Sequence, residues 1–67
     1  MTVGDDQLRS PSWLAQRLGK SAKTLETWRR QGTGPAFVRV GRDIRYRESD
    51  VERWLTAQTV GKAVDRG

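Results

Sequence analysis

The first hydrophobic pattern along the chain has the spacing of a short helix. Ser10 before Pro11 is an N-cap followed by proline at the first helical position, and Gly19 can end the helix in a left-handed conformation. These signals predict a helix over residues 11–18. Its apolar face is formed by Leu14, Ala15 and Leu18.

A second helix is predicted over residues 22–31, and only residues 19–21 join it to the first. Two helices with so short a glycine-containing turn are typical of the helix-turn-helix unit. On a helical wheel Leu25 and Trp28 lie on one side of the second helix and are expected to face the first. The opposite side begins at the N-cap Ser21 and carries Lys23, Thr24, Thr27 and Arg30.

Alternating residues in the next segment predict a β-hairpin. One strand is expected over residues 37–40 and the other over 44–47, with residues 41–43 as the turn. The side chains expected to face the core are Val38, Val40, Ile44 and Tyr46. Under this assignment the arginines between them face outward. These are Arg39, Arg45 and Arg47, with Arg42 at the hairpin tip.

The last regular element is a third helix, for which Ser49 is the predicted N-cap, running to about Gln58. Helix, helix, hairpin and helix in this order indicate an α+β, mainly α fold of the winged helix-turn-helix type. The domain is expected to span residues 9–58. Residues 1–8 are expected to form a flexible N-terminal arm, and residues 59–67 a flexible C-terminal tail.

Composition narrows the function. The chain has 67 residues with 13 Lys and Arg against 8 Asp and Glu, which gives a formal net charge of +5. It contains neither Cys nor His, so the usual metal ligands and the usual general base are missing, and we expect no enzyme, no cofactor and no metal site. No apolar run is long enough for a membrane helix and no signal peptide is evident, so we expect a cytoplasmic protein.

The charge favours nucleic acid as the partner. Ten of the 13 basic residues are Arg, whose guanidinium pairs with phosphates and with guanine edges. The polar side of the second helix either enters a DNA major groove or is merely solvated, and its place before a basic hairpin favours the groove. The hairpin arginines either contact phosphates and the minor groove or only discourage strand-to-strand aggregation. Four arginines in the hairpin are more than the prevention of aggregation needs, which favours the DNA contacts.

The tryptophans carry separate expectations. Trp28 and Trp54 lie on the apolar faces of their helices and are expected in the core. Trp13 either covers the edge of the core or contacts a partner.

The chain resembles the small MerR-like winged-helix proteins of the excisionase family over about residues 8–57. The most specific part is the basic hairpin at residues 40–47 followed by the helix start at residues 49–55. The resemblance rests on Ser10-Pro11, Leu14-Ala15, Leu18-Gly19, Thr24-Leu25, Trp28-Arg29, Gly34-Pro35, Phe37 to Arg47, Ser49-Asp50-Val51 and Trp54-Leu55.

This resemblance implies a recombination directionality factor of a phage or mobile element. Such proteins bind repeated sites beside an attachment sequence, often cooperatively with other copies, bend the DNA and direct an integrase towards excision. The alternative is an AlpA-like transcriptional regulator acting at a promoter, and a third class is a module that binds an acidic protein. By position, the resemblance makes Lys23, Thr24, Thr27 and Arg30 recognition contacts and Arg42 the wing tip. Lys20 departs from the family, in which a small apolar residue is usual at this place in the turn, and we expect it to add a phosphate contact.

Overall fold

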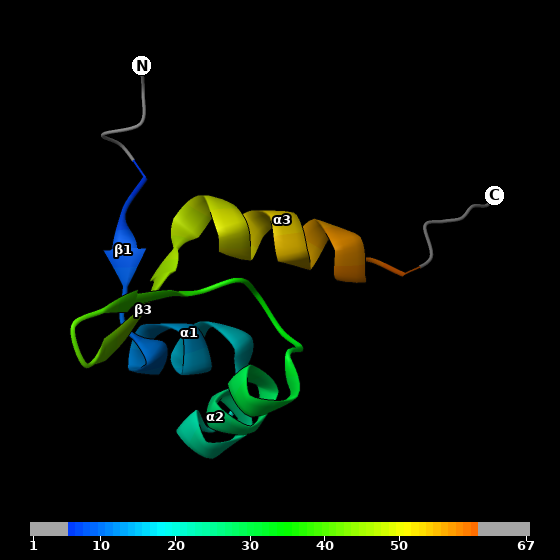
Figure 1. The fold of residues 1–67 in the computed structure, drawn as a ribbon. Helices are drawn as coiled ribbons and strands as arrows, with labels where there is room; N and C mark the ends of the chain where they lie inside the picture. The colour runs from blue at the N-terminus through cyan, green and yellow to red at the C-terminus, as the bar shows by residue number, and fades with distance from the viewer. Residues whose placement is uncertain (1–5, 61–67) are drawn as a thin grey trace, which may run out of the picture.

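The computed structural model describes residues 6–60, and Figure 1 shows the elements within them. Their order confirms the winged helix-turn-helix fold, and the first two helices have the predicted bounds. The elements are β1 (Leu8–Arg9), α1 (Pro11–Leu18), α2 (Ala22–Gln31), β2 (Val38–Val40), β3 (Asp43–Arg47) and α3 (Glu48–Gln58).

The core lies where the three helices and β3 meet. Its buried side chains come from all four of these elements, so every helix contributes its apolar face. They are Leu14 and Ala15 of α1, Leu25 of α2, Tyr46 of β3 and Val51 of α3. Half-buried apolar side chains surround this centre: Trp13, Leu18, Trp28, Phe37, Ile44 and Leu55.

Helix α3 follows β3 directly and extends beyond the other elements (Figure 1). Trp54 packs on Trp28 of α2 with ring centroids 5.4 Å apart, a spacing favourable for aromatic pairs. Trp28 packs against the buried core, as predicted, whereas Trp54 is half-buried and lies against Trp28 rather than among the core residues. The helix ends at Gln58, also as predicted.

The sheet corrects the predicted faces of the hairpin. Arg39 lies opposite Ile44, and Val38 lies opposite Arg45. Residues directly opposite in an antiparallel pair share a face, so Arg39 lies on the inner face with Ile44, whereas Val38 lies on the outer face with Arg45. The expectation that Val38 and Val40 face the core is therefore wrong, and Val40 is 50% exposed.

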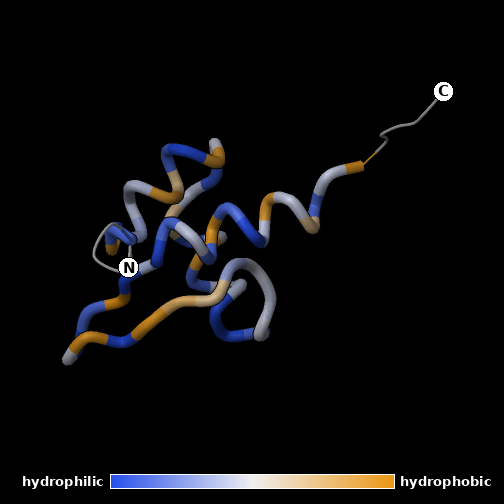
Figure 2. Tube along the Cα trace, turned by 90° about the horizontal axis from the view of Figure 1, so that it is seen from above, coloured by the Kyte–Doolittle hydropathy of each residue, from blue (hydrophilic) through white to orange (hydrophobic). Residues whose placement is uncertain are grey.

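The physical reason is the length of the turn. Val40 pairs with Asp43, so only Gly41 and Arg42 form the turn, in place of the predicted residues 41–43. Gly41 has a φ of 61°, as the primed turns of two-residue hairpins require. One residue fewer in the turn shifts the register and moves every side chain of one strand to the other face. Figure 2 shows the hydrophobic stretch entering β2, with one hydrophilic position within it.

The predicted N-terminal arm is partly structured. Residues 8 and 9 form β1, which pairs with β3 at its other edge: Leu8 lies opposite Arg47 and Arg9 opposite Tyr46. Arg9 also pairs with Glu48 of α3. Residues 6–8 of the predicted arm therefore lie in contact with β3 and the start of α3. Residues 1–5 of the arm, and 61–67 of the predicted tail, lie outside the residues that the structure describes.

The arm also provides the cap of α3. This helix begins directly after β3, and Arg47 at the N-cap position makes no side-chain cap bond. The carboxylate of Asp6 instead accepts hydrogen bonds from the Ser49 backbone N–H at 3.0 Å and from its hydroxyl at 2.7 Å. The prediction that Ser49 caps the helix is wrong. Ser49 lies inside the first turn, and an acid from the N-terminal segment complements the positive end of the helix dipole.

Candidate nucleic-acid interface

The turn between α1 and α2 is held by local hydrogen bonds. Gly19 ends α1 with a φ of 68°, a conformation that glycine adopts without strain. The Lys20 backbone N–H then donates to the Ala15 carbonyl at 2.9 Å. Ser21 accepts from the Thr24 backbone N–H at 3.1 Å and so caps α2. These bonds fix the direction of α2 relative to α1.

The outward face of α2 brings the predicted recognition residues together. Lys23 and Arg30 are exposed, and Thr24 and Thr27 are half-buried beside them. The Ser21 hydroxyl lies 3.0 Å from the Thr24 hydroxyl, so both are oriented at the start of the helix. Buried Leu25 anchors the opposite side of α2 in the core. The face thus presents a polar and basic surface on a rigid support.

Ion pairs gather on the side of the molecule that carries α3. Arg17 of α1 lies 2.5 Å from Glu52, and Arg53 lies 3.0 Å from Asp50. Arg47 at the end of β3 lies 3.4 Å from the same Asp50. The acidic residues of α3 therefore neutralise the arginines around them.

The remaining basic side chains lie together on the turn, α2 and the wing, which is the β2–β3 hairpin. Within residues 6–60, none of these has a carboxylate within 4.0 Å of its charged nitrogens, in contrast to the five paired arginines. They are Lys20, Lys23, Arg29, Arg30, Arg39 and Arg42. We call these six side chains the basic face; the carboxylate of Glu26 lies on the same side of α2 as Arg29 and Arg30 but within 4.0 Å of none of their charged nitrogens.

The four arginines predicted for the wing divide into two pairs. Arg39 and Arg42 are exposed and belong to the basic face. Arg45 folds back on the hairpin, where it donates to the Ile44 carbonyl at 2.7 Å and lies 3.9 Å from Asp43. Arg47 is directed to α3 by its ion pair. The structure thus does not bring Arg45 and Arg47 together with the other two.

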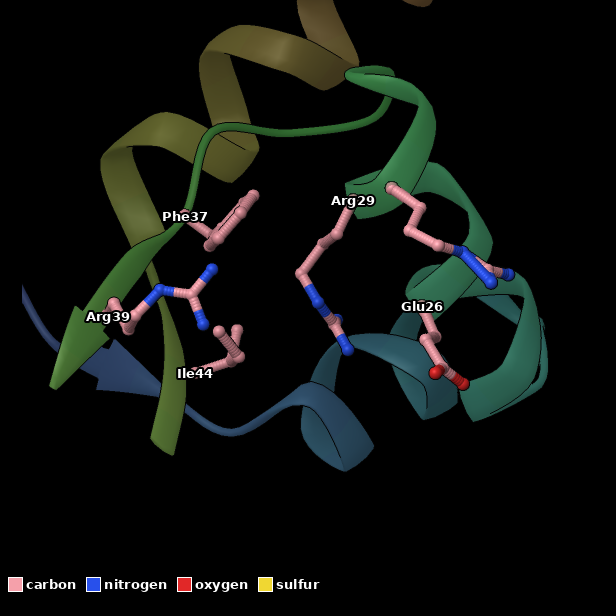
Figure 3. A pocket seen from close by; sticks show the side chains of 6 residues that line it. Glu26, Arg29, Phe37, Arg39 and Ile44 are labelled. Atoms are coloured by element: carbon pink, nitrogen blue, oxygen red, sulfur yellow. The ribbon is translucent and has the colours of Figure 1, made fainter. Parts of the chain in front are cut away.

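A groove of about 330 Å³ separates α2 from the wing. Arg29 from α2 and Arg39 from β2 extend into the same space from its two sides (Figure 3). Phe37 and Ile44 form the apolar wall on the wing side. The complete lining is Glu26, Arg29, Arg30, Phe37, Arg39 and Ile44.

Sequence reasoning missed Arg29 as a site residue. Its guanidinium donates to the buried Tyr46 hydroxyl at 2.8 Å and lies 6.0 Å from the Phe37 ring centroid. Arg29 therefore bridges α2 and the sheet. A signal was present on the helical wheel, where Arg29 falls beside the buried Leu25 rather than on the solvated side.

A second hollow, of about 610 Å³, is formed by α1, the turn and the start of α2. Its only charged lining residue is Lys20, the predicted phosphate contact, and the wall includes the hydroxyl-bearing Ser10 and Ser12 at the start of α1. Trp13 also lines it. The Trp13 ring is flanked by the guanidiniums of Arg9 at 5.3 Å and Arg17 at 5.6 Å, which favours its role as a cover of the core edge.

Other kinds of site find little support in the described part of the chain. Between residues 6 and 60, no group of three or more His, Cys, Asp or Glu residues is placed to hold a metal ion. Over the same residues, no helix has the length and apolar character required to cross a membrane.

Comparison with known proteins agrees with this geometry. The model of a family described as a helix-turn-helix domain matches residues 11–59, from the start of α1 to just beyond α3. No curated protein and no solved structure matches the chain.

Proposed function

The chain belongs to the helix-turn-helix domain family, which is found in excisionase-like and AlpA-like small DNA-binding proteins, and on that premise we propose that it is an excisionase. It would bind attachment-site DNA in a sequence-specific manner, bend it, and direct a site-specific integrase towards excision. The segregation of unpaired basic side chains onto one face carries this proposal.

The shape of the basic face fits duplex DNA. A helix with its side chains is about 10–12 Å across, and the major groove of B-DNA is about 12 Å wide. With α2 in that groove, Lys23 and Arg30 can donate to guanine, and Thr27 can hydrogen-bond a base or contact a thymine methyl. Arg42 at the wing tip can then reach the neighbouring minor groove or its phosphates.

The electrostatics support binding driven by phosphate contacts. Each phosphate neutralised by Lys or Arg releases counterions, so log K falls with log salt with a slope of about −0.9 per contact on B-DNA. The six unpaired Lys and Arg side chains of the basic face allow at most about six phosphate contacts per copy of the protein. Bending a site by 40–90° costs on the order of 1–6 kcal/mol, so one small domain profits from cooperative binding with other copies on repeated sites.

A promoter-binding regulator with the same fold is the second candidate, because the family includes AlpA-like proteins. The basic face serves both functions equally. The two differ in where the protein binds and in how many copies bind side by side.

A footprint across the attachment and promoter regions of the native genetic element, titrated in protein and in salt, tests the proposal. Several adjacent repeats at the attachment site that become protected together support the excisionase function. A single protected site over a promoter supports the regulator. Absence of salt-sensitive protection on any of these regions would overturn both and direct attention to an acidic protein partner.

A further inference from the structure

We propose that the groove between α2 and the wing holds one backbone phosphodiester of the bound duplex. Arg29 and Arg39 would bind the phosphate oxygens, and Phe37 with Ile44 would contact the adjoining deoxyribose. This inference rests on the proposed DNA binding and adds the place where one strand of the backbone is seated. In this arrangement Arg39 contacts the phosphate directly, and Arg29 contacts both the phosphate and Tyr46 of the sheet.

The charge of the groove calls for an anion. Three arginines and one glutamate line it, and none of these arginines has a carboxylate within 4.0 Å among the described residues. Glu26 belongs to α2 and lies on the other side of Arg29 from the apolar wall (Figure 3). Arg29 and Arg39 therefore face a common space with no protein anion between them. A phosphate at that place offsets their mutual repulsion.

The groove is also preorganised. The register of the sheet places Arg39 on the inner face, opposite Ile44, and so turns it towards α2 and away from the outer surface of the wing. Arg29 is held by its bond to Tyr46, whose side chain is 1% exposed. A bidentate donor that is already oriented loses less conformational entropy on binding.

The size and the walls fit a sugar–phosphate unit. The volume of about 330 Å³ is near the lower end of the range of about 300–1,000 Å³ typical of small-molecule sites. Phe37 and Ile44 are half-buried, so their exposed parts offer an apolar surface to a sugar ring. The protein groove separates α2 from the wing. The DNA strand bound in it would therefore run between the major groove, which α2 enters, and the wing tip.

The first test is the salt dependence of binding to a random duplex, measured by fluorescence anisotropy. Arg39→Gln should reduce the slope of log K against log salt by about 0.9. The control is Arg53→Gln on α3, an exposed arginine paired with Asp50, which should leave the slope unchanged. Both variants should unfold at the urea midpoint of the original protein. An unchanged slope for Arg39→Gln overturns the inference while leaving DNA binding itself intact.

The second test locates the phosphate. On a site found by footprinting, single phosphates are replaced by neutral methylphosphonates. Replacement of one particular phosphate should weaken binding of the original protein. The same replacement should have little further effect on the Arg39→Gln variant, because that variant already lacks the contact between Arg39 and this phosphate. Additive losses at every position would overturn the inference. Saturable binding of inorganic phosphate to the free protein, with no coupled position in DNA, would assign the groove to a free anion and overturn it as well.

Discussion

The Arg29 guanidinium donates a 2.8 Å hydrogen bond to the Tyr46 hydroxyl and thereby joins α2 to β3, the central strand of the sheet. Tyr46 is almost fully buried, and its ring lies 6.2 Å from that of Phe37 at the entry to β2. Within residues 6–60, no other side-chain hydrogen bond or ion pair joins α2 to β2 or β3. The position of the wing relative to α2 therefore depends on this bond and on the apolar packing around it.

Tyr46→Phe removes the hydroxyl and keeps the ring. Because Arg29 is only half-buried and can regain water, we expect a loss of about 1.5 kcal/mol in the free energy of unfolding, at the lower end of the range for hydrogen bonds to charged groups. Urea unfolding should show a lower midpoint with an unchanged m-value. DNA affinity should also fall, since the wing is less firmly placed. Arg30→Gln, an exposed neighbour on α2, is the control and should change stability by less than about 0.5 kcal/mol.

Gly34 lies against the ring of Trp28 and should tolerate no side chain. Its φ is 80°, and an added Cβ would lie 2.8 Å from Trp28 Cε3. Gly34→Ala should therefore cost the left-handed strain of roughly 1–2 kcal/mol together with an overpacking penalty of about 1–3 kcal/mol. Gly41→Ala at the wing turn has a φ of 61° but meets nothing within 4 Å, so it should cost the strain alone. Equal urea midpoints for the two variants would contradict the clash with Trp28.

The two helices of the helix-turn-helix could be predicted because their signals are local. Ser21 caps α2 from the residue before it, and Gly19 ends α1 one residue after it. Such capping bonds join residues only three to five apart, so the pattern of neighbouring residues contains them. The polar face of α2 follows from the same periodicity once Leu25 is assigned to the core.

The wing faces and the N-terminal segment depended on information that neighbouring residues do not contain. A turn one residue shorter than expected moved the side chains of β2 to the opposite faces of the sheet and so turned Arg39 inward. The cap of α3 comes from Asp6, 43 residues before Ser49, so no local pattern could indicate it. Arg29 could not be identified as a site residue from the sequence, because its role depends on its hydrogen bond to Tyr46, whose position only the folded chain specifies.

The contact between Asp6 and Ser49 should make stability depend on pH. The Ser49 hydroxyl, then its backbone N–H, and to a lesser extent Arg47 and Arg53, hold the pKa of the Asp6 carboxyl below its usual value of 3.8. A carboxyl whose pKa is lower in the folded state contributes stability above the unfolded pKa and loses it as the pH falls through the folded pKa. The contribution should therefore be present at pH 7 and fade below about pH 4.

Asp6→Asn measures this contribution. At pH 7 its urea midpoint should lie below that of the original protein, and the difference should shrink as the pH falls below about 4. Ser49→Ala removes the hydroxyl donor and should show the same trend. The double variant should lose less than the sum of the two single losses, because both act on one contact. A difference that stays constant from pH 7 to pH 3 would show that Asp6 acts by packing alone.

Substitutions on the outward face of α2 and at the wing tip should change DNA binding in different ways. Thr27 and Arg30 lie on the face of α2 that would enter the major groove, so Thr27→Ala and Arg30→Ala should change which sequences are preferred, with about 1–3 kcal/mol of discrimination lost for a good bidentate base contact. Arg42 is at the tip of the wing, where we expect it to contact phosphates rather than base edges. Arg42→Ala should therefore weaken binding to specific and random duplexes alike. Competition between a selected site and random DNA at one salt concentration separates the two effects, and equal losses on both duplexes for all three variants would contradict the assignment of α2 as the element that reads the bases.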